Sequence, residues 1–129
     1  MSKILVIDDD KDFQEFICYF LQSSGYETAS AFDAEEGIRK VGSENPDLVI
    51  LDVMMPSGLE GFTVARKVRE ELNLVELPII MLTAVHQVVK VPYRFVPDDR
   101  WLPVDRFVDK PVDPNQLLAR ISELLTGKG

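Results

Sequence analysis

The sequence has 129 residues, a length typical of one domain, and we expect a single domain over residues 1–129. Hydrophobic residues make up 46% of the chain and charged residues 28%, the usual balance for an apolar core under a charged surface. The formal net charge of -8 argues against direct nucleic-acid binding, which needs clustered Lys and Arg. No apolar run reaches the roughly 20 residues that insert across a membrane, and the single cysteine, Cys18, fits a reducing compartment. We therefore expect a cytoplasmic protein.

Strand-like and helical patterns alternate in the first part of the chain. An apolar run at 3–7 predicts a strand buried on both faces, and apolar residues at helical spacing follow at 13–21. A second strand is expected at 26–29. Asp33 is a candidate N-cap of a second helix, which we expect to end near Gly42.

The rest of the chain repeats this alternation. Apolar runs predict strands at 47–51 and 77–82, with a helix from about 62 to 71 between them. A short strand at 105–108 precedes a final helix, which Asp113 can cap. Such alternation is typical of a parallel sheet with helices on both faces.

Polar side chains stand where the apolar runs end. Ligands of such sheets bind outside the carboxyl ends of the strands, and the residues found there are Asp8, Asp9, Asp52, Thr83 and Lys110. Three carboxylates at one edge repel one another and favour a hard divalent cation, Mg²⁺ or Mn²⁺. With a hydroxyl and an ammonium group beside them, they form a set that can stabilise a phosphoryl group during in-line transfer to a carboxylate.

The sequence resembles the receiver domain of two-component response regulators over nearly the whole chain. Four segments carry the resemblance: ILVIDDD at 4–10, LDVMMP at 51–56, MLTA at 81–84 and DKP at 109–111. Each segment alone has low specificity, whereas all four in this order at strand ends are highly specific. The family includes the chemotaxis-Y-like receivers. The resemblance implies an α/β, flavodoxin-like, doubly wound sheet of five parallel strands in the order 2-1-3-4-5.

The resemblance also implies phosphorelay signal transduction. Asp52 would accept a phosphoryl group from a sensor histidine kinase or a phosphotransfer protein, in a Mg²⁺-dependent reaction. Asp8, Asp9 and Asp52 would hold the cation together with the backbone carbonyl of Met54.

Further roles follow from the same resemblance. Thr83 and Lys110 would each contact a phosphoryl oxygen, and Thr83 with Phe107 would form a switch that alters the binding of a downstream protein. The bond between Lys110 and Pro111 is often cis in this family. The expected protein is a signalling domain with weak intrinsic autophosphatase activity, and not an enzyme that turns over an external substrate.

Two stretches depart from the family pattern. The turn at 56–61 has one residue more than usual. The family has an amphipathic helix within 85–104, where this chain contains Pro92, Pro97 and Pro103. Each proline inside a helix is unfavourable by about 3 kcal/mol. We therefore expect an irregular segment in place of much of that helix.

Two other interpretations remain open at the sequence level. A phosphatase of the haloacid-dehalogenase type would use the Asp-x-Asp spacing of Asp8 and Asp10, but it needs a late acidic pair after an apolar strand. The late pair at 98–99 follows a proline instead. The second alternative is a receiver-like module that binds partners without phosphotransfer. The intact set of Asp52, Asp9, Thr83 and Lys110 argues against this module, whereas the altered segment at 85–104 keeps it open.

Overall fold

The computed structural model describes residues 2–53, 60–74, 76–83 and 104–126. Within these residues all neighbouring strands pair in parallel, in the order β2-β1-β3-β4-β5. The strands are β1 Lys3–Ile7, β2 Glu27–Ala31, β3 Leu48–Asp52, β4 Ile79–Thr83 and β5 Arg106–Asp109. The expected strand order is confirmed.

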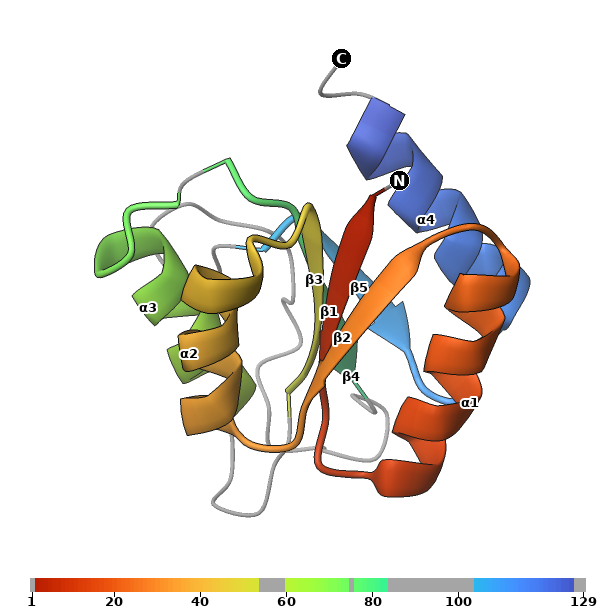
Figure 1. Ribbon diagram of the computed structural model, residues 1–129, viewed down its shortest axis with the longest axis horizontal. Coiled ribbons are helices and arrows are strands. Elements are labelled where there is room, and N and C mark those ends of the chain that lie inside the picture. Colours follow the sequence, from red (N-terminus) through yellow and green to blue (C-terminus); the bar gives the residue numbers. More distant parts are fainter. Residues whose placement is uncertain (1, 54–59, 75, 84–103, 127–129) are drawn as a thin grey trace.

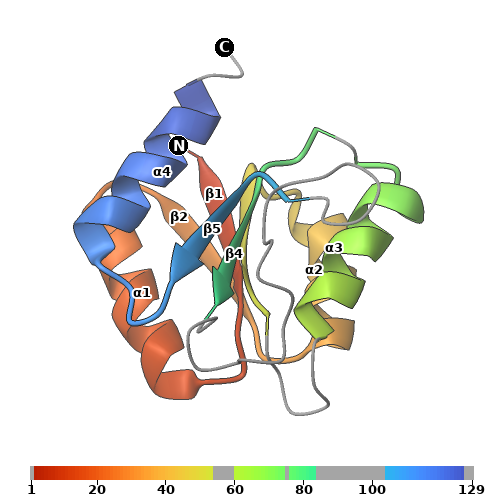
Figure 2. The same ribbon diagram turned by 180° about the vertical axis from the view of Figure 1, so that it is seen from behind.

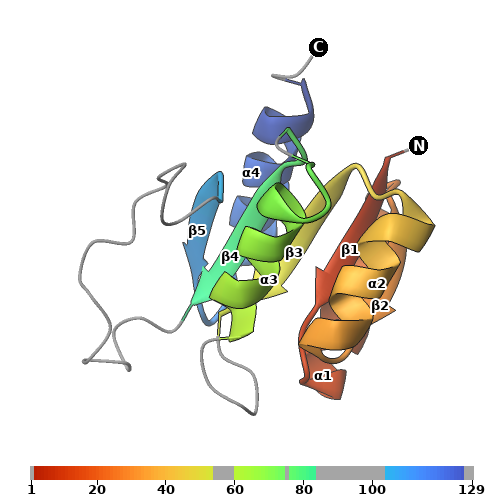
Figure 3. The same ribbon diagram turned by 90° about the vertical axis from the view of Figure 1, so that its left-hand side faces the viewer.

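Helices cover both faces of this sheet. They are α1 Lys11–Ser23, α2 Ala34–Glu44, α3 Glu60–Glu70 and α4 Pro114–Thr126. Helices α2 and α3 lie side by side on one face (Figures 1 and 3), while α1 and α4 cover the other (Figure 2). The irregular segment expected at 85–104 lies outside the described residues apart from Val104.

The strands read as continuous apolar runs because each buries both faces. In β1, Leu5 and Ile7 pack in the cluster that includes residues of α2 and α3, whereas Ile4 and Val6 pack with residues of α1 and α4. All four side chains are fully buried. Alternate side chains of a strand point to opposite faces, so two layers of helices require apolar residues at successive positions.

The boundaries of α2 show where a local signal was misread. Asp33 caps the helix as expected, since its Oδ1 accepts a 2.7 Å hydrogen bond from the Glu36 amide. The expected end at Gly42 is wrong, because the helix continues to Glu44. It stops at Asn45, which has a left-handed backbone with φ of 52°. Asparagine adopts this conformation more readily than most residues, so it can replace glycine at a helix end.

The parallel arrangement brings the carboxyl ends of all five strands to one edge, the lower edge of the sheet in Figure 1. Residues far apart in the sequence meet there. None of the helices among the described residues has the length and apolar character required to cross a membrane.

Candidate functional site

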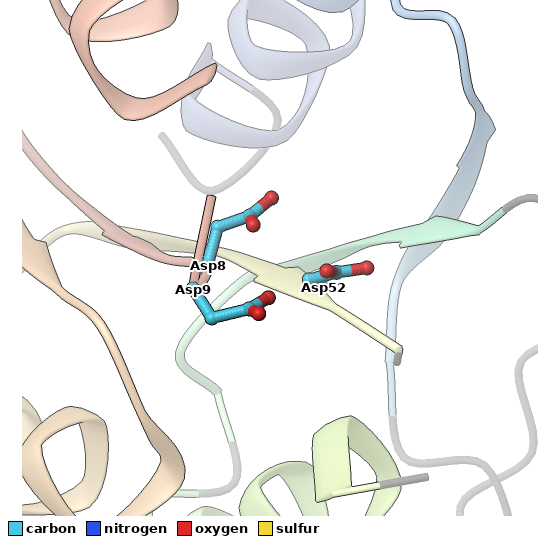
Figure 4. A group of neighbouring side chains, drawn as sticks. All are labelled: Asp8, Asp9 and Asp52. Carbon is cyan, nitrogen blue, oxygen red and sulfur yellow. The ribbon is translucent and has the colours of Figure 1, made fainter. Parts of the chain in front are cut away.

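Three carboxylates converge at the carboxyl ends of β1 and β3. Asp8, Asp9 and Asp52 each offer one oxygen, and these oxygens lie within 4.8 Å of one another. Figure 4 shows the three side chains extending from the ends of the two strands. Asp8 is fully buried and Asp52 is 6% exposed, whereas Asp9 is exposed. The sheet thus brings together the three carboxylates that the sequence analysis selected.

The connection between β1 and α1 holds this cluster in place. The Asp8 amide donates to the carbonyl of Ala31 at 3.0 Å, which ties the ends of β1 and β2 together. Asp8 Oδ1 accepts a 2.9 Å hydrogen bond from the Asp10 amide. Asp10 is the N-cap of α1, and its Oδ1 accepts from the Phe13 amide at 3.1 Å. The third acidic residue of the run therefore starts the helix, as one cap needs one carboxylate.

The backbone around Asp52 is enclosed by the start of α3. The Gly61 amide donates to the carbonyl of Val53 at 3.0 Å. A Cβ atom on residue 61 would collide with the carbonyl oxygen of Asp52 and would lie 2.7 Å from Val53 Cα. Only glycine permits this close approach, so α3 packs directly on the backbone that carries the Asp52 carboxylate.

Lys110 directly follows β5, the last strand of the sheet, and its side chain reaches the carboxylate cluster. Its Nζ lies 3.3 Å from Asp8 Oδ2 and 3.4 Å from Asp52 Oδ2. Its amide donates to the Thr83 carbonyl at 2.8 Å, and its Nζ lies 5.1 Å from the centroid of the Phe13 ring. The peptide bond that follows Lys110 is cis, as expected.

The electrostatics of the site follow from burial and from this ion pairing. Burial raises the pKa of Asp8, and the hydrogen bond from the Asp10 amide and the charge of Lys110 offset that effect only in part. Burial alone would lower the pKa of Lys110, but Asp8 and Asp52 more than compensate, so its pKa is raised. When ionised, the three carboxylates outnumber the one ammonium group and leave two negative charges in excess. That charge and the all-oxygen donor set fit a hard divalent cation.

The remaining predicted site residues lie on or beside β4 and β5. Thr83 is the last residue of β4, is 4% exposed and pairs with Asp109. The backbone of Phe107 belongs to β5 and pairs with Met81, but the structure does not describe the Phe107 side chain. Met54 also lies outside the described residues, as does most of the turn at 56–61.

Two residues that contribute to this site were not predicted from the sequence. Gly61 carries no local signal, because its role depends on a strand that ends nine positions earlier. Gln14 is fully enclosed on the inward face of α1, at the spacing of Ile17 and Leu21. A polar residue in an otherwise apolar stripe was the available signal.

The family model for the response regulator receiver domain matches residues 4–122. The chain belongs to this family. It is a receiver domain of two-component response regulators, a signalling class and not one of metabolic enzymes. The match separates it from phosphatases of the haloacid-dehalogenase type.

Two curated relatives illustrate the similarity. The alkaline phosphatase synthesis transcriptional regulatory protein PhoP of Bacillus subtilis (strain 168) is 35% identical over 124 residues. The probable transcriptional regulator ycf27 of Cyanophora paradoxa is 41% identical over 128 residues. Each alignment covers 96% of this chain and 48% of the relative. The receiver chain thus spans about half the length of the curated relatives it matches.

Solved receivers have the same fold. The response regulator TrrA from Thermotoga maritima, in complex with Mg²⁺-BeF, is 34% identical with a TM-score of 0.78, over 97% of this chain and 100% of that one. A CheY-like receiver domain protein from Methanospirillum hungatei JF-1 is 27% identical with a TM-score of 0.81, over 98% of this chain and 95% of that one. These likenesses confirm the flavodoxin-like architecture.

Proposed function

We propose that this receiver domain accepts a phosphoryl group on Asp52 from a phosphohistidine of a sensor kinase or phosphotransfer protein. The observation that carries the proposal is the position of the Asp52 carboxylate. It lies 3.4 Å from Lys110 and within 4.8 Å of the oxygens of Asp8 and Asp9. The Asp52 carboxylate, an ammonium group and a second pair of carboxylates therefore lie at one edge of the sheet. Phosphoryl transfer to an aspartate needs these groups as nucleophile, charge stabiliser and cation ligands.

The cation is Mg²⁺ or Mn²⁺ in this proposal. Asp8, Asp9 and Asp52 would hold it, with the backbone carbonyl of Met54 as a further ligand by resemblance to the family. When bound, the cation neutralises the carboxylates and the charge that develops on the phosphoryl oxygens. The structure of TrrA in complex with Mg²⁺-BeF supports this choice for the family.

The transfer itself exchanges one bond to phosphorus for another. An oxygen of Asp52 forms the new O–P bond while the N–P bond of the phosphohistidine breaks, and the electron pair of that bond remains on the imidazole nitrogen. Lys110 stabilises the oxygens of the phosphoryl group with its positive charge. Thr83, at the end of the neighbouring strand, would donate its hydroxyl to another of these oxygens.

The switch and the removal of the phosphoryl group complete the proposal. Thr83 and Phe107 would respond to the phosphoryl group and change the binding of a downstream protein. Water would hydrolyse the acyl phosphate slowly, because Met54 and Val85, two positions after Asp52 and Thr83, are apolar and cannot orient a water by hydrogen bonding. The receiver would then be a switch with weak autophosphatase activity.

The curated relatives bear on the output of the signal. PhoP, ycf27 and the DNA-binding dual master regulator RpaA of Synechocystis are named as transcriptional regulators, and this chain matches about half of each. The net charge of -8 disfavours direct contact between this domain and nucleic acid. A protein partner is therefore the expected recipient of the signal.

Intact-mass measurement tests the proposal. Wild-type protein incubated with acetyl phosphate and Mg²⁺ should gain the mass of one phosphoryl group, and Asp52→Asn should gain none. Asp10→Asn is the matched control, because asparagine replaces aspartate as an N-cap equally well, and it should gain the phosphoryl group as the wild type does. An undiminished gain in Asp52→Asn would contradict the assignment.

A further inference from the structure

Gln14 places its side-chain amide at the point where β1 and β2 end. The side chain is 3% exposed. Its Nε2 lies 2.9 Å from the carbonyl oxygen of Val6, 3.2 Å from that of Asp8 and 2.9 Å from that of Ala31. An amide nitrogen has two hydrogens to donate, so three backbone carbonyls share them.

The Asp8 carbonyl lies between the two neighbouring candidate metal ligands in the backbone. It belongs to the peptide group that joins Asp8 to Asp9. Successive residues of a strand point to opposite faces of the sheet, yet both carboxylates have oxygens within 4.8 Å of one another. Strand β1 ends at Ile7, so the peptide between Asp8 and Asp9 lies just beyond the regular strand, and the Gln14 amide donates to its carbonyl.

The other end of Gln14 is anchored within α1. Its backbone amide donates to the Asp10 carbonyl at 3.0 Å, and its Oε1 faces Cys18 Sγ at 3.6 Å. The first turn of α1 begins at the Asp10 cap, so the helix that follows the acidic run also supplies the donor that fixes it. The Oε1 contact with Cys18 involves no atom of the cation site.

We propose that Gln14 is a positioning residue of the cation site: it orients the peptide between Asp8 and Asp9 so that both carboxylates face the same ion. The inference rests on the proposed metal-dependent function. A residue that merely fills the core would be replaceable by methionine, which is also unbranched and flexible. A positioning residue is not replaceable in this way, because methionine has no hydrogen to donate to the Asp8 carbonyl.

The test compares the affinity of the folded protein for Mg²⁺ in two variants, by calorimetric titration well below the melting temperature. Gln14→Met should weaken the affinity about ten- to a hundredfold, the usual effect of removing a group that orients metal ligands. Cys18→Ala removes the partner of Oε1 but leaves the three carbonyl contacts, so its affinity should equal that of the wild type.

A double mutant separates positioning from general loosening. In an Asp9→Asn background the orientation of the Asp8–Asp9 peptide no longer serves two carboxylates. Gln14→Met should then reduce the remaining affinity for Mg²⁺ by a smaller factor than in the wild type. Equal factors in both backgrounds would contradict a role through Asp9.

A measurement on the wild type covers the case in which Gln14→Met does not fold. The side-chain amide protons of Gln14 should exchange slowly with solvent, and their NMR signals should shift on addition of Mg²⁺. Gln22 lies on the same helix as Gln14, and its exposed side-chain amide donates to Thr28 Oγ1 of β2, so its signals should not shift. Unshifted Gln14 signals, or wild-type affinity in Gln14→Met with only a lower melting temperature, would overturn the inference. Failure of wild-type protein to bind Mg²⁺ would overturn the proposed function as well.

Discussion

Truncation of Asp9 gives a clean test of cation binding, because Asp9 is the exposed member of the carboxylate cluster. Asp9→Ala opens no buried cavity and leaves the ion pairs of Lys110 with Asp8 and Asp52 in place. In EDTA, its unfolding free energy should lie within about 0.5 kcal/mol of the wild type, as for most surface substitutions.

The effect should become large when Mg²⁺ is present. At free Mg²⁺ a hundredfold above the wild-type Kd, binding to the folded state alone stabilises it by about 2.7 kcal/mol. Unfolding entropy of about 2.1 cal/mol/K per residue gives about 0.27 kcal/mol/K for 129 residues. The wild-type Tm should therefore rise by about 10 °C. If the variant binds about a hundredfold more weakly, the stabilisation falls to about 0.4 kcal/mol and the rise to about 1.5 °C.

The assay is calorimetric or fluorescence-monitored melting of each protein in EDTA and in Mg²⁺. Asp12→Ala is the matched control, because Asp12 is an exposed acidic residue in the first turn of α1 outside the carboxylate cluster. It loses a favourable interaction with the helix N-terminus in both conditions, so its Mg²⁺-dependent rise should match that of the wild type. An equal rise in Asp9→Ala would show that Asp9 is not a principal ligand.

Two further predictions concern Lys110 and Asp8. The Phe13 ring should stabilise the Lys110 ammonium by about 0.5–1 kcal/mol, so a double-mutant cycle of Phe13→Leu with Lys110→Met should show a coupling of that size in the unfolding free energy. The same cycle with Phe13→Tyr should show almost no coupling, because tyrosine keeps the aromatic ring. Zero coupling in the first cycle would contradict the contact. The pKa of Asp8 is raised above its ordinary value of 3.8, so between these two values the folded state binds more protons and Asp8 lowers stability as the pH rises. In EDTA, the unfolding free energy of Asp8→Asn minus that of the wild type should therefore increase as the pH rises from below 3.8 and then level off. A flat or falling difference would refute the shift. In Mg²⁺ at neutral pH, the wild type should have the larger unfolding free energy.

Much of this fold could be predicted from the sequence, because the parallel sheet is covered on both faces. Strand β3 is buried at every position, and its residues before Asp52 form an unbroken apolar run. Apolar runs followed by Asp8, Asp52 and Thr83 therefore located three strand ends within a residue or two. The N-cap at Asp33 was also predicted, since the capping side chain and its partner lie three positions apart.

The contacts that depend on distant parts of the chain could not be predicted in this way. Lys110 meets Asp8 across 102 positions, and the Gln14 amide meets the Ala31 carbonyl across 17. Neither pairing leaves a local pattern. Gly61 resembles an ordinary turn residue until the start of α3 is packed against the Asp52 backbone.

The central claim is that Asp52 carries the phosphoryl group, and chemical mapping tests it most directly. Borohydride reduces an aspartyl phosphate to homoserine with release of phosphate, which marks the modified residue permanently. After treatment with acetyl phosphate and Mg²⁺, reduction and proteolysis, mass spectrometry should find homoserine at position 52 and unmodified aspartate at positions 8, 9 and 10. Homoserine at position 8 with intact Asp52 would contradict the account.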